Sequence, residues 1–281
     1  LKSFYSSNSD TSSLCSSLVY DVMVDSKNTL WVATSKGLNK FLDFGKGFKQ
    51  YSRKSLACSN CLVNNEVLCL HEDKNGYIWI GTVGGLNRFD PEKEQFKSYT
   101  EQDGLSNNLI YSILEDKKGN LWLSSNMGIS KFDPLAETFL NFDIYDGLQD
   151  YEFNHLAAYK AADGEMFFGG ISGLNSFYPD SISKYSFIPN VEITSVEVIT
   201  NKEKRTLDLI ASDSISISPR NNLITIEFAS LDLIQPSQNK YAYKLKGVED
   251  EWVDIGTRRY ATFSNLPPGE YVFRVKGSNN D

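Results

Sequence analysis

The sequence is poor in the side chains on which most catalytic sites depend: its 281 residues include two histidines and four cysteines. The two histidines, His71 and His155, lie far apart in the chain. The sequence also lacks a Gly-x-Ser-x-Gly elbow, a His-Glu-x-x-His zinc motif and a phosphate-binding loop. We therefore predict no catalytic residues, no bound cofactor and no enzymatic activity for this chain.

An excess of positive charge is also missing. The formal net charge is −8, which argues against nucleic acid or an anionic membrane surface as a partner of the chain. No apolar stretch reaches the length of a transmembrane helix, and no signal peptide is present. Leu1 is not a natural start, so we expect the chain to be a segment of a longer protein.

The cysteines do not form a zinc-binding pattern. Cys58-Ser-Asn-Cys61 is a C-x-x-C motif, with Cys15 and Cys69 elsewhere and His71 as the nearest histidine. A zinc site needs two further ligands at suitable spacing, and a redox motif needs a thioredoxin-type βαβ unit, which is absent. Free thiols, a local disulfide and a metal site remain as alternatives in that order of preference, and we assign no metal ligand.

What the sequence does contain is a phrase that recurs four times. An Asp-containing turn leads to an aromatic residue, and a glycine follows six residues later. The turn phrases are Asp25–Trp31, Asp73–Trp79, Asp116–Trp122 and a weaker copy at Asp163–Phe167. The second phrases are Gly37-Leu-Asn-Lys-Phe41, Gly85-Leu-Asn-Arg-Phe89, Gly128-Ile-Ser-Lys-Phe132 and Gly173-Leu-Asn-Ser-Phe177. The glycines are 48, 43 and 45 residues apart, which matches one four-stranded β-propeller blade per copy.

Each repeat reads as four antiparallel strands. Alternating residues before the Asp, such as Val22 and Val24, indicate a strand with one buried face. The Asp and Gly then form a hairpin turn, and the Trp on the next strand can fill the wedge between blades. A third strand follows the glycine, and the fourth is predicted at 48–51, 96–99 and 139–142. We expect Trp31, Trp79 and Trp122 at equivalent buried positions.

The chain begins with a phrase that resembles an outer strand. Leu1-Lys-Ser-Phe4 is similar to Phe96-Lys-Ser-Tyr99, so we predict a strand that belongs to a repeat whose other strands are absent. This strand could close a ring by pairing with the last blade. We favour the alternative of a larger propeller with further blades upstream, because four blades is the low end of the range.

After residue 187 the pattern changes. Short alternating segments at 191–199, 214–217, 223–228, 241–245, 252–255, 260–263 and 271–276 predict about seven strands, as in a β-sandwich. We therefore predict an all-β chain with propeller blades, part of a propeller, over residues 1–187. An immunoglobulin-like β-sandwich is predicted over residues 188–281, with Trp252 and Phe273 in its core.

The two parts together resemble a known family. The blade phrases are similar to regulator-propeller repeats of two-component systems. The segments Tyr241-Ala-Tyr-Lys-Leu-Lys-Gly-Val-Glu-Asp-Glu-Trp252 and Arg259–Tyr271 resemble the triple-tyrosine (Y_Y_Y) domain that follows such repeats. The resemblance implies the periplasmic sensor region of a hybrid histidine kinase, anchored in the inner membrane and dimeric. It further implies an oligosaccharide ligand, whose binding the sandwich relays.

Loops before the first strand of each blade are the predicted ligand site, because loops at one rim carry function in such folds. Their amides, carboxylate and aromatic ring suit sugar hydroxyls and sugar rings, although Asn and Asp in loops more often cap turns. The candidates are Asn64, Asn65, Asn107, Asn108, Gln149, Tyr151, Glu152 and Asn154. Two alternative functions remain open, a propeller enzyme acting on polysaccharide and a protein-interaction propeller.

Overall fold

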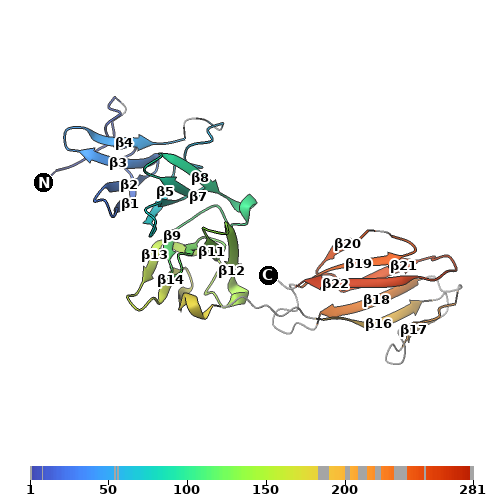
Figure 1. The fold of residues 1–281 in the computed structure, drawn as a ribbon. Helices are drawn as coiled ribbons and strands as arrows, with labels where there is room; N and C mark the ends of the chain where they lie inside the picture. Colours follow the sequence, from blue (N-terminus) through green and yellow to red (C-terminus); the bar gives the residue numbers. More distant parts are fainter. Residues whose placement is uncertain are drawn as a thin grey trace. The chain divides into compact units, whose positions relative to one another are not determined.

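The computed structural model confirms the all-β prediction, and it divides into two compact units, residues 1–183 and 184–281 (Figure 1). The structure describes residues 2–7, 9–53, 55, 57–182, 190–199, 203–207, 214–218, 223–230, 239–249 and 251–278. The boundary predicted between residues 187 and 188 lies outside the described residues. No helix in the described ranges is long and apolar enough to span a membrane.

The first unit holds four antiparallel sheets, one for each repeat. The first contains β1 (Val19–Val24), β2 (Leu30–Thr34), β3 (Gly37–Asp43) and β4 (Gly47–Tyr51). The second contains β5 (Val67–Glu72), β6 (Ile78–Thr82), β7 (Gly85–Asp90) and β8 (Gln95–Tyr99). The third contains β9 (Ser112–Glu115), β10 (Leu121–Ser124), β11 (Ile129–Asp133) and β12 (Thr138–Phe142). The fourth contains β13 (Phe153–Lys160), β14 (Met166–Gly170) and β15 (Gly173–Phe177).

The sheets are propeller blades. Within each sheet the strands pair in chain order, and the first strands of successive sheets lie beside one another: β1 by β5, β5 by β9 and β9 by β13. This places the first strand of each blade innermost. Short 3₁₀ helices follow the second and third blades, η1 (Glu101–Asp103) and η2 (Ile144–Asp146), and η3 (Pro179–Ser181) follows β15.

The described residues of the fourth blade form a sheet of three strands, and residues 183–189, which follow η3 in the chain, lie outside the described part. The outer strands of the other blades end on the phrase Phe-x-x-Tyr or Phe-x-x-Phe, and no such phrase follows Phe177. Instead, Pro179 lies in the first turn of η3, and a proline there lacks the N–H that an outer strand would donate.

The three tryptophans are buried at equivalent positions, as predicted: Trp31, Trp79 and Trp122 are 0%, 0% and 1% exposed. Each contacts the following blade through an aromatic ring. Trp31 meets Phe89 at 5.7 Å, Trp79 meets Phe132 at 5.7 Å and Trp122 meets Phe177 at 4.8 Å between ring centroids. The apolar clusters that join the blades form around these rings.

Two expectations near the beginning of the chain are wrong. Residues 2–5 form no strand, and the nearest pairing is a single bridge between Ser6 and Leu14. Phe4 instead packs its ring on Phe48 at 5.2 Å. Val22 and Val24 lie on a strand as predicted, but they are 61% and 59% exposed, because no described repeat packs on that side of β1.

The second unit is a pair of sheets, as predicted. One has the order β17 (Lys204–Leu207), β16 (Val191–Ile199), β18 (Leu223–Ser230) and β21 (Tyr260–Ser264). The other has the order β20 (Val253–Gly256), β19 (Lys240–Lys246) and β22 (Val272–Ser278). Inward side chains of both sheets form one core around Val196, Phe228, Tyr241 and Leu245, against which Phe273 packs.

Two predictions about the sandwich are wrong. Trp252 is not a core residue: it lies just before β20, 41% exposed, with the Lys276 Nζ 4.6 Å from its ring centre. The predicted strand at 214–217 is an irregular segment, although Ile217 still contacts the core. The seventh strand is β17, which the sequence did not indicate because Lys204-Arg-Thr-Leu207 carries little apolar alternation.

Among the cysteine alternatives, the structure shows the local disulfide. Cys58 and Cys61 are bonded in the loop between β4 and β5, whereas Cys15 and Cys69 are free thiols. Burial raises the pKa of the Cys15 thiol to about 11 and also raises that of the fully buried Cys69.

Candidate functional site

The predicted site residues lie at one end of the blades, where each loop enters its innermost strand. Backbone bonds tie each of these loops to the turn between the second and third strands of a blade, for example Val83 N to Glu66 O and Ile171 N to Glu152 O. The Asp-containing turns lie at the other end of the strands. We call the first the loop end and the second the turn end.

Several predicted amides serve the loop itself. Asn64 Oδ1 accepts from Glu66 N at 2.8 Å, and Asn107 Oδ1 accepts from Leu109 N at 2.9 Å, so both cap a turn two residues on. Asn65 uses both amide atoms on the backbone of Arg53. The Asn108 Oδ1 accepts from Glu101 N at 2.9 Å. These contacts fix loop shape and leave few groups for a ligand.

The fourth loop, which leads into β13, differs from the other three because some of its polar side chains have no partner within the loop. Gln149 is structural, since its Nε2 donates to Glu152 O at 3.0 Å and its Oε1 accepts from Ser172 N at 2.6 Å. The side chains of Glu152 and Asn154 are exposed and make no hydrogen bond to a described residue. Partial burial, with Asp143 and Tyr145 nearby, raises the pKa of Tyr151. Of the predicted residues, Glu152 and Asn154 keep polar groups available, and Tyr151 adds an aromatic ring beside Tyr145.

A wide bulge in β13 comes directly after the fourth loop in the chain. The pairing with β14 passes from Phe153↔Gly170 to Ala158↔Phe168, so residues 154–157 oppose a single residue. Within the bulge Leu156 has φ 54°, a left-handed conformation that is unfavourable for a branched side chain. Such strain and such bulges cluster where a strand re-aims a side chain at a functional site.

The bulge directs His155 toward the other innermost strands. His155 Nε2 lies 2.8 Å from Leu68 O on β5, and the ring meets that of Tyr20 on β1 edge-on at 5.7 Å. Leu156 N donates to Tyr111 O just before β9. Innermost-strand segments of all four blades therefore meet at His155. Sequence patterns could not indicate this meeting of strands, because the contacts join residues of different repeats.

The carboxylates of Asp21 and Glu66 lie in the same cluster as His155. We call this group the channel cluster (Tyr20, Asp21, Glu66, Tyr111 and His155). The Tyr20 hydroxyl donates to Glu66 Oε1 at 2.8 Å, and this bond raises the pKa of Tyr20. Burial raises the pKa of Asp21, although hydrogen bonds from Leu70 N and Val22 N and the nearby His155 oppose that rise. Burial and the charge of Glu152 raise the pKa of Tyr111, so the cluster adjoins the fourth loop.

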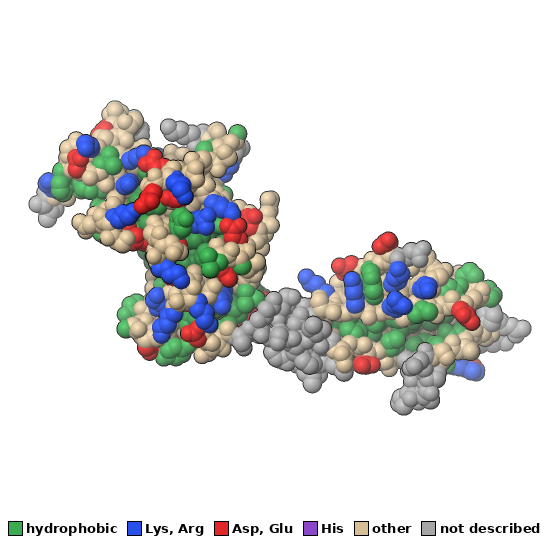
Figure 2. Space-filling view, viewed as in Figure 1, with side chains coloured by type: hydrophobic (Ala, Val, Ile, Leu, Met, Phe, Trp, Pro, Cys, Tyr) green, Lys and Arg blue, Asp and Glu red, His purple; other side chains and the backbone are tan. Residues whose placement is uncertain are grey.

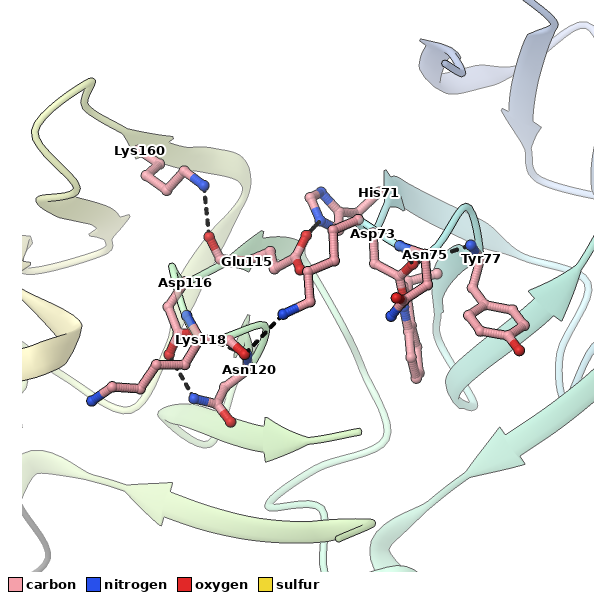
Figure 3. A network of polar contacts seen from close by, with 11 residues as sticks. His71, Asp73, Asn75, Tyr77, Glu115, Asp116, Lys118, Asn120 and Lys160 are labelled. Atoms are coloured by element: carbon pink, nitrogen blue, oxygen red, sulfur yellow. Dashed lines mark hydrogen bonds and ion pairs between the residues drawn. The ribbon is translucent and has the colours of Figure 1, made fainter. Parts of the chain in front are cut away.

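Side chains at the turn end form a network of polar contacts between blades (Figure 3). His71 Nε2 lies 3.2 Å from Glu115 Oε2 between the second and third blades, and Lys160 Nζ donates to Glu115 O at 2.7 Å from the fourth. Lys74 Nζ likewise donates to the backbone of Lys118 at 3.1 Å. These partners satisfy one another and bind neighbouring blades together, which indicates a structural role.

The described residues contain no group of three or more His, Cys, Asp or Glu side chains placed to hold a metal ion. In those residues the two histidines also sit at different heights of the blades, one paired with a carboxylate and one with a backbone carbonyl. The channel cluster with the fourth loop thus offers hydroxyls, a carboxylate, an amide and aromatic rings, which suits recognition of a ligand rich in hydroxyl groups.

Comparison with known families identifies both units. The two-component regulator propeller family matches residues 61–84 and 104–127, and the Y_Y_Y domain family matches residues 232–281. The extracellular domain of the putative hybrid two component system BT3049 from B. thetaiotaomicron superposes with a TM-score of 0.83 at 29% identity. That match covers 95% of this chain and 36% of the solved domain. The chain carries two-component regulator propeller repeats followed by a Y_Y_Y domain.

Two further similar proteins are shorter or more distant matches to this chain. Histidine kinase P4 of Formosa agariphila is 31% identical over 137 residues, 46% of this chain and 10% of the kinase. The extracellular domain of the putative one component system BT4673 from B. thetaiotaomicron is 19% identical, with a TM-score of 0.37 over 93% of this chain and 54% of that domain. The matched residues of this chain thus cover a tenth of the kinase, and the chain covers about a third of the BT3049 domain.

Proposed function

We propose that this chain is the ligand-sensing region of a hybrid histidine kinase, that it lies in the periplasm, and that its ligand is an oligosaccharide. The observation that carries the proposal is the order of the two units: regulator-propeller repeats followed by a Y_Y_Y domain, in a chain 95% covered by the extracellular domain of a putative hybrid two component system. The parent receptor is then anchored in the inner membrane and dimeric.

The fourth loop and the channel cluster support the ligand class. Tyr151 offers an aromatic surface, and Glu152 and Asn154 offer acceptors and donors that no described residue occupies. The adjoining β13 bulge holds a strained Leu156, and such strain is retained where the surrounding structure serves a function. The other predicted amides cap turns and contribute to the shape of the rim.

The sandwich is suited to relay a change. Its first strand, β16, and its last strand, β22, lie close together: a Cβ on Gly277 would lie 2.8 Å from Val191 Cγ2. Chain entering the sandwich and chain leaving it therefore share one end of that unit. A ligand shifts the activity of the kinase only if it binds two states of the receptor with different affinity. The common end of the sandwich is where we expect the resulting change in conformation to be transmitted to the rest of the receptor.

Calorimetry of the purified chain against a panel of neutral and acidic oligosaccharides tests the proposal. For an oligosaccharide that binds, Tyr151→Ala with Asn154→Ala should weaken binding at least tenfold, about 1.4 kcal/mol. The matched control, Asn75→Ala with Tyr77→Ala, removes the same residue types at the turn end and should leave affinity unchanged.

Three outcomes contradict parts of the proposal. Equal losses in both double variants would assign the effect to damaged blades, and normal binding in the loop variant would remove the fourth loop as the site. Steady release of reducing ends from a polysaccharide would favour the alternative of a propeller enzyme and would overturn the sensor function.

A further inference from the structure

The fourth loop lies in a part of the propeller that carries charge of one sign. The loop end of the third and fourth blades is formed by residues 100–111, 125–128, 143–154 and 170–173. These segments contain acids but no Lys or Arg. The cations of residues 100–182 lie elsewhere on the blades: Lys117, Lys118, Lys131 and Lys160.

These cations are engaged away from the loop end. At the turn end, Lys117 Nζ donates to Asp163 O at 2.7 Å, and Lys118 Nζ lies 2.7 Å from Asp180 Oδ1. Lys131 lies midway along β11, over a buried indole ring. Strands β10 and β14, of four and five residues, separate the two ends by about 13–17 Å. Because the Debye length is about 8 Å at physiological salt, the turn-end cations do little to balance charge at the loop end.

Three carboxylates lie in the fourth loop beside the groups proposed to contact a ligand. Asp143 accepts from a backbone N–H of η2 at 2.7 Å. Asp150 accepts from Tyr151 N at 2.7 Å and from the Ser172 hydroxyl at 2.8 Å. These donors are neutral, so they fix the two carboxylates in place without cancelling their charge. Glu152 is exposed and makes no hydrogen bond to a described residue.

Two tyrosines of the site respond to these charges. Desolvation raises the pKa of Tyr151, and the charges of Asp143 and Asp150 add to the rise. Burial and the charge of Glu152 raise the pKa of Tyr111 in the channel cluster. The negative charge therefore acts on the rings beside which a ligand would lie.

The same region is short of free hydrogen-bond donors. The N–H groups of Gly128 and Phe153 join the fourth loop to the β10–β11 turn, and a third backbone bond joins it to the β14–β15 turn. In the β10–β11 turn, Asn126 Oδ1 is buried without a donor. Of the exposed side chains in the fourth loop, the Glu152 carboxylate can only accept, whereas the Asn154 amide can donate and accept. A ligand here must therefore supply donors.

Other surfaces of the propeller carry both signs of charge. Ion pairs join successive blades, as in Lys27–Glu92 and Lys97–Glu137. On the face of the propeller that is in view, Figure 2 shows Lys and Arg side chains interspersed with Asp and Glu. The lack of cations sets the loop end of the third and fourth blades apart from these surfaces.

We propose that the fourth loop selects oligosaccharides without acid groups, either neutral sugars or sugars with a protonated amino group. The inference rests on the proposed function, because it takes the fourth loop as the ligand site. Sugar hydroxyls and ammonium groups donate to carboxylates. A uronate or a sulfate would instead place like charge beside Asp150 and Glu152, and repulsion of this kind excludes a wrong ligand.

Calorimetry of the whole chain tests the selectivity with matched sugars. The neutral probes are gluco-, galacto- and manno-oligosaccharides, and chitosan oligosaccharides are the amino probe. The acidic probes are the same neutral oligosaccharides after oxidation of their primary hydroxyls to carboxylates. We expect a neutral or amino probe to bind, and the oxidised form of a neutral probe that binds should bind at least tenfold more weakly. Rising salt should narrow that difference, because it screens the repulsion.

A charge reversal identifies the residue responsible. Glu152→Lys should reduce the preference for the neutral form over the oxidised form at least tenfold, and it should weaken binding of the amino probe. The control, Glu165→Lys, makes the same change in net charge at the turn end and should alter the preference less than twofold. Since the preference is a ratio of two affinities in one variant, a general loss of folded protein cancels.

The outcomes separate this inference from the proposed function. An oxidised probe that binds as well as its neutral parent overturns the inference, as does an unchanged preference in Glu152→Lys. If Tyr151→Ala with Asn154→Ala abolishes the binding of that oxidised probe, the proposed function stands. If no probe binds, or if binding is independent of Tyr151 and Asn154, the fourth loop is not the ligand site and both proposals for it fail.

Discussion

The Trp79 indole nitrogen donates a hydrogen bond to Asp73 Oδ2 at 2.7 Å, and the same bond recurs in the first and third repeats. The other oxygen of Asp73 accepts from Asn75 N and Tyr77 N, so one carboxylate closes the turn and satisfies the buried indole. The left-handed position of the turn holds Gly76, and in the first repeat Asn28 at φ 62°, a residue that tolerates this conformation.

The fourth repeat lacks both partners. The turn there runs from Ala161 to Glu165, bonded as in the other repeats, with Gly164 at the left-handed position. Ala161 therefore occupies the place of the Asp, and Phe167 that of the Trp; the sequence comparison had matched Asp163 instead. Asp163 is exposed and accepts from the Tyr178 hydroxyl at 3.1 Å. Losing both partners avoids the buried unsatisfied group that losing one would leave.

A double-mutant cycle on Asp73 and Trp79 follows from this comparison. Trp79→Phe leaves one Asp73 oxygen without its buried donor and should cost about 2–4 kcal/mol, including lost packing. Asp73→Ala should cost a similar amount, because two backbone donors lose their acceptor. The double variant should cost about 1 kcal/mol less than the sum. Urea denaturation measures all three, and strict additivity would show that the bond contributes nothing.

The two aromatic residues predicted for the sandwich core should behave differently. Phe273→Ala removes a ring packed on Phe228, Tyr243 and Phe263 and should cost about 3 kcal/mol. Trp252→Ala removes a ring that is 41% exposed and lies outside the core cluster, and it should cost clearly less, about 1 kcal/mol or below. The unfolding transition of the sandwich, followed by circular dichroism, compares them. A large effect of Trp252→Ala would contradict its surface position.

Alkylation with a thiol reagent tests the cysteine assignments. In denaturant without reductant, two cysteines, Cys15 and Cys69, should be labelled, because Cys58 and Cys61 are bonded. In the folded chain at pH 7, Cys15 should react slowly, since burial raises its pKa to about 11 and little thiolate is present. Mass spectrometry counts the labels. Four labels without reductant would disprove the disulfide.

An ion pair between blades should make stability depend on pH. Lys49 Nζ lies 2.6 Å from Glu94 Oε2, and the Tyr51 hydroxyl donates to the same carboxylate. The bond to Lys49 lowers the pKa of Glu94 below its ordinary 4.5. A lowered folded pKa means that the pair stabilises the chain above pH 4.5 and that this contribution disappears as pH falls through the lowered value.

Glu94→Gln therefore should destabilise the propeller at pH 7 by at most about 1 kcal/mol, the range for exposed ion pairs. At an acidic pH well below 4.5 the difference from the parent chain should be much smaller than at pH 7. Thermal unfolding at both pH values checks this, with Glu101→Gln as a carboxylate control outside the blade contacts. An equal difference at both pH values would show that the effect is steric.

The sequence by itself determined the repeat and its local chemistry. Asp, Gly and Trp at fixed spacing specify a turn and a buried ring through interactions within a few residues, so the blades and the buried tryptophans could be predicted. The outward and inward alternation of β19 and β22 could be predicted in the same way. Turn formation and strand alternation depend on residues that are only a few positions apart, so the sequence is enough to predict them.

Only the tertiary structure showed the features that depend on contacts between distant parts of the chain. His155 meets Leu68 and Tyr20 because a bulge turns β13 toward strands from other repeats. Trp252 lies on the surface although its apolar ring suggested the core, since the core was already filled by residues of the two sheets. Lys244 opposes Arg274 only through the register of two strands that are separated in the chain. Burial and pairing across such separations depend on the packing of whole sheets, which no local pattern specifies.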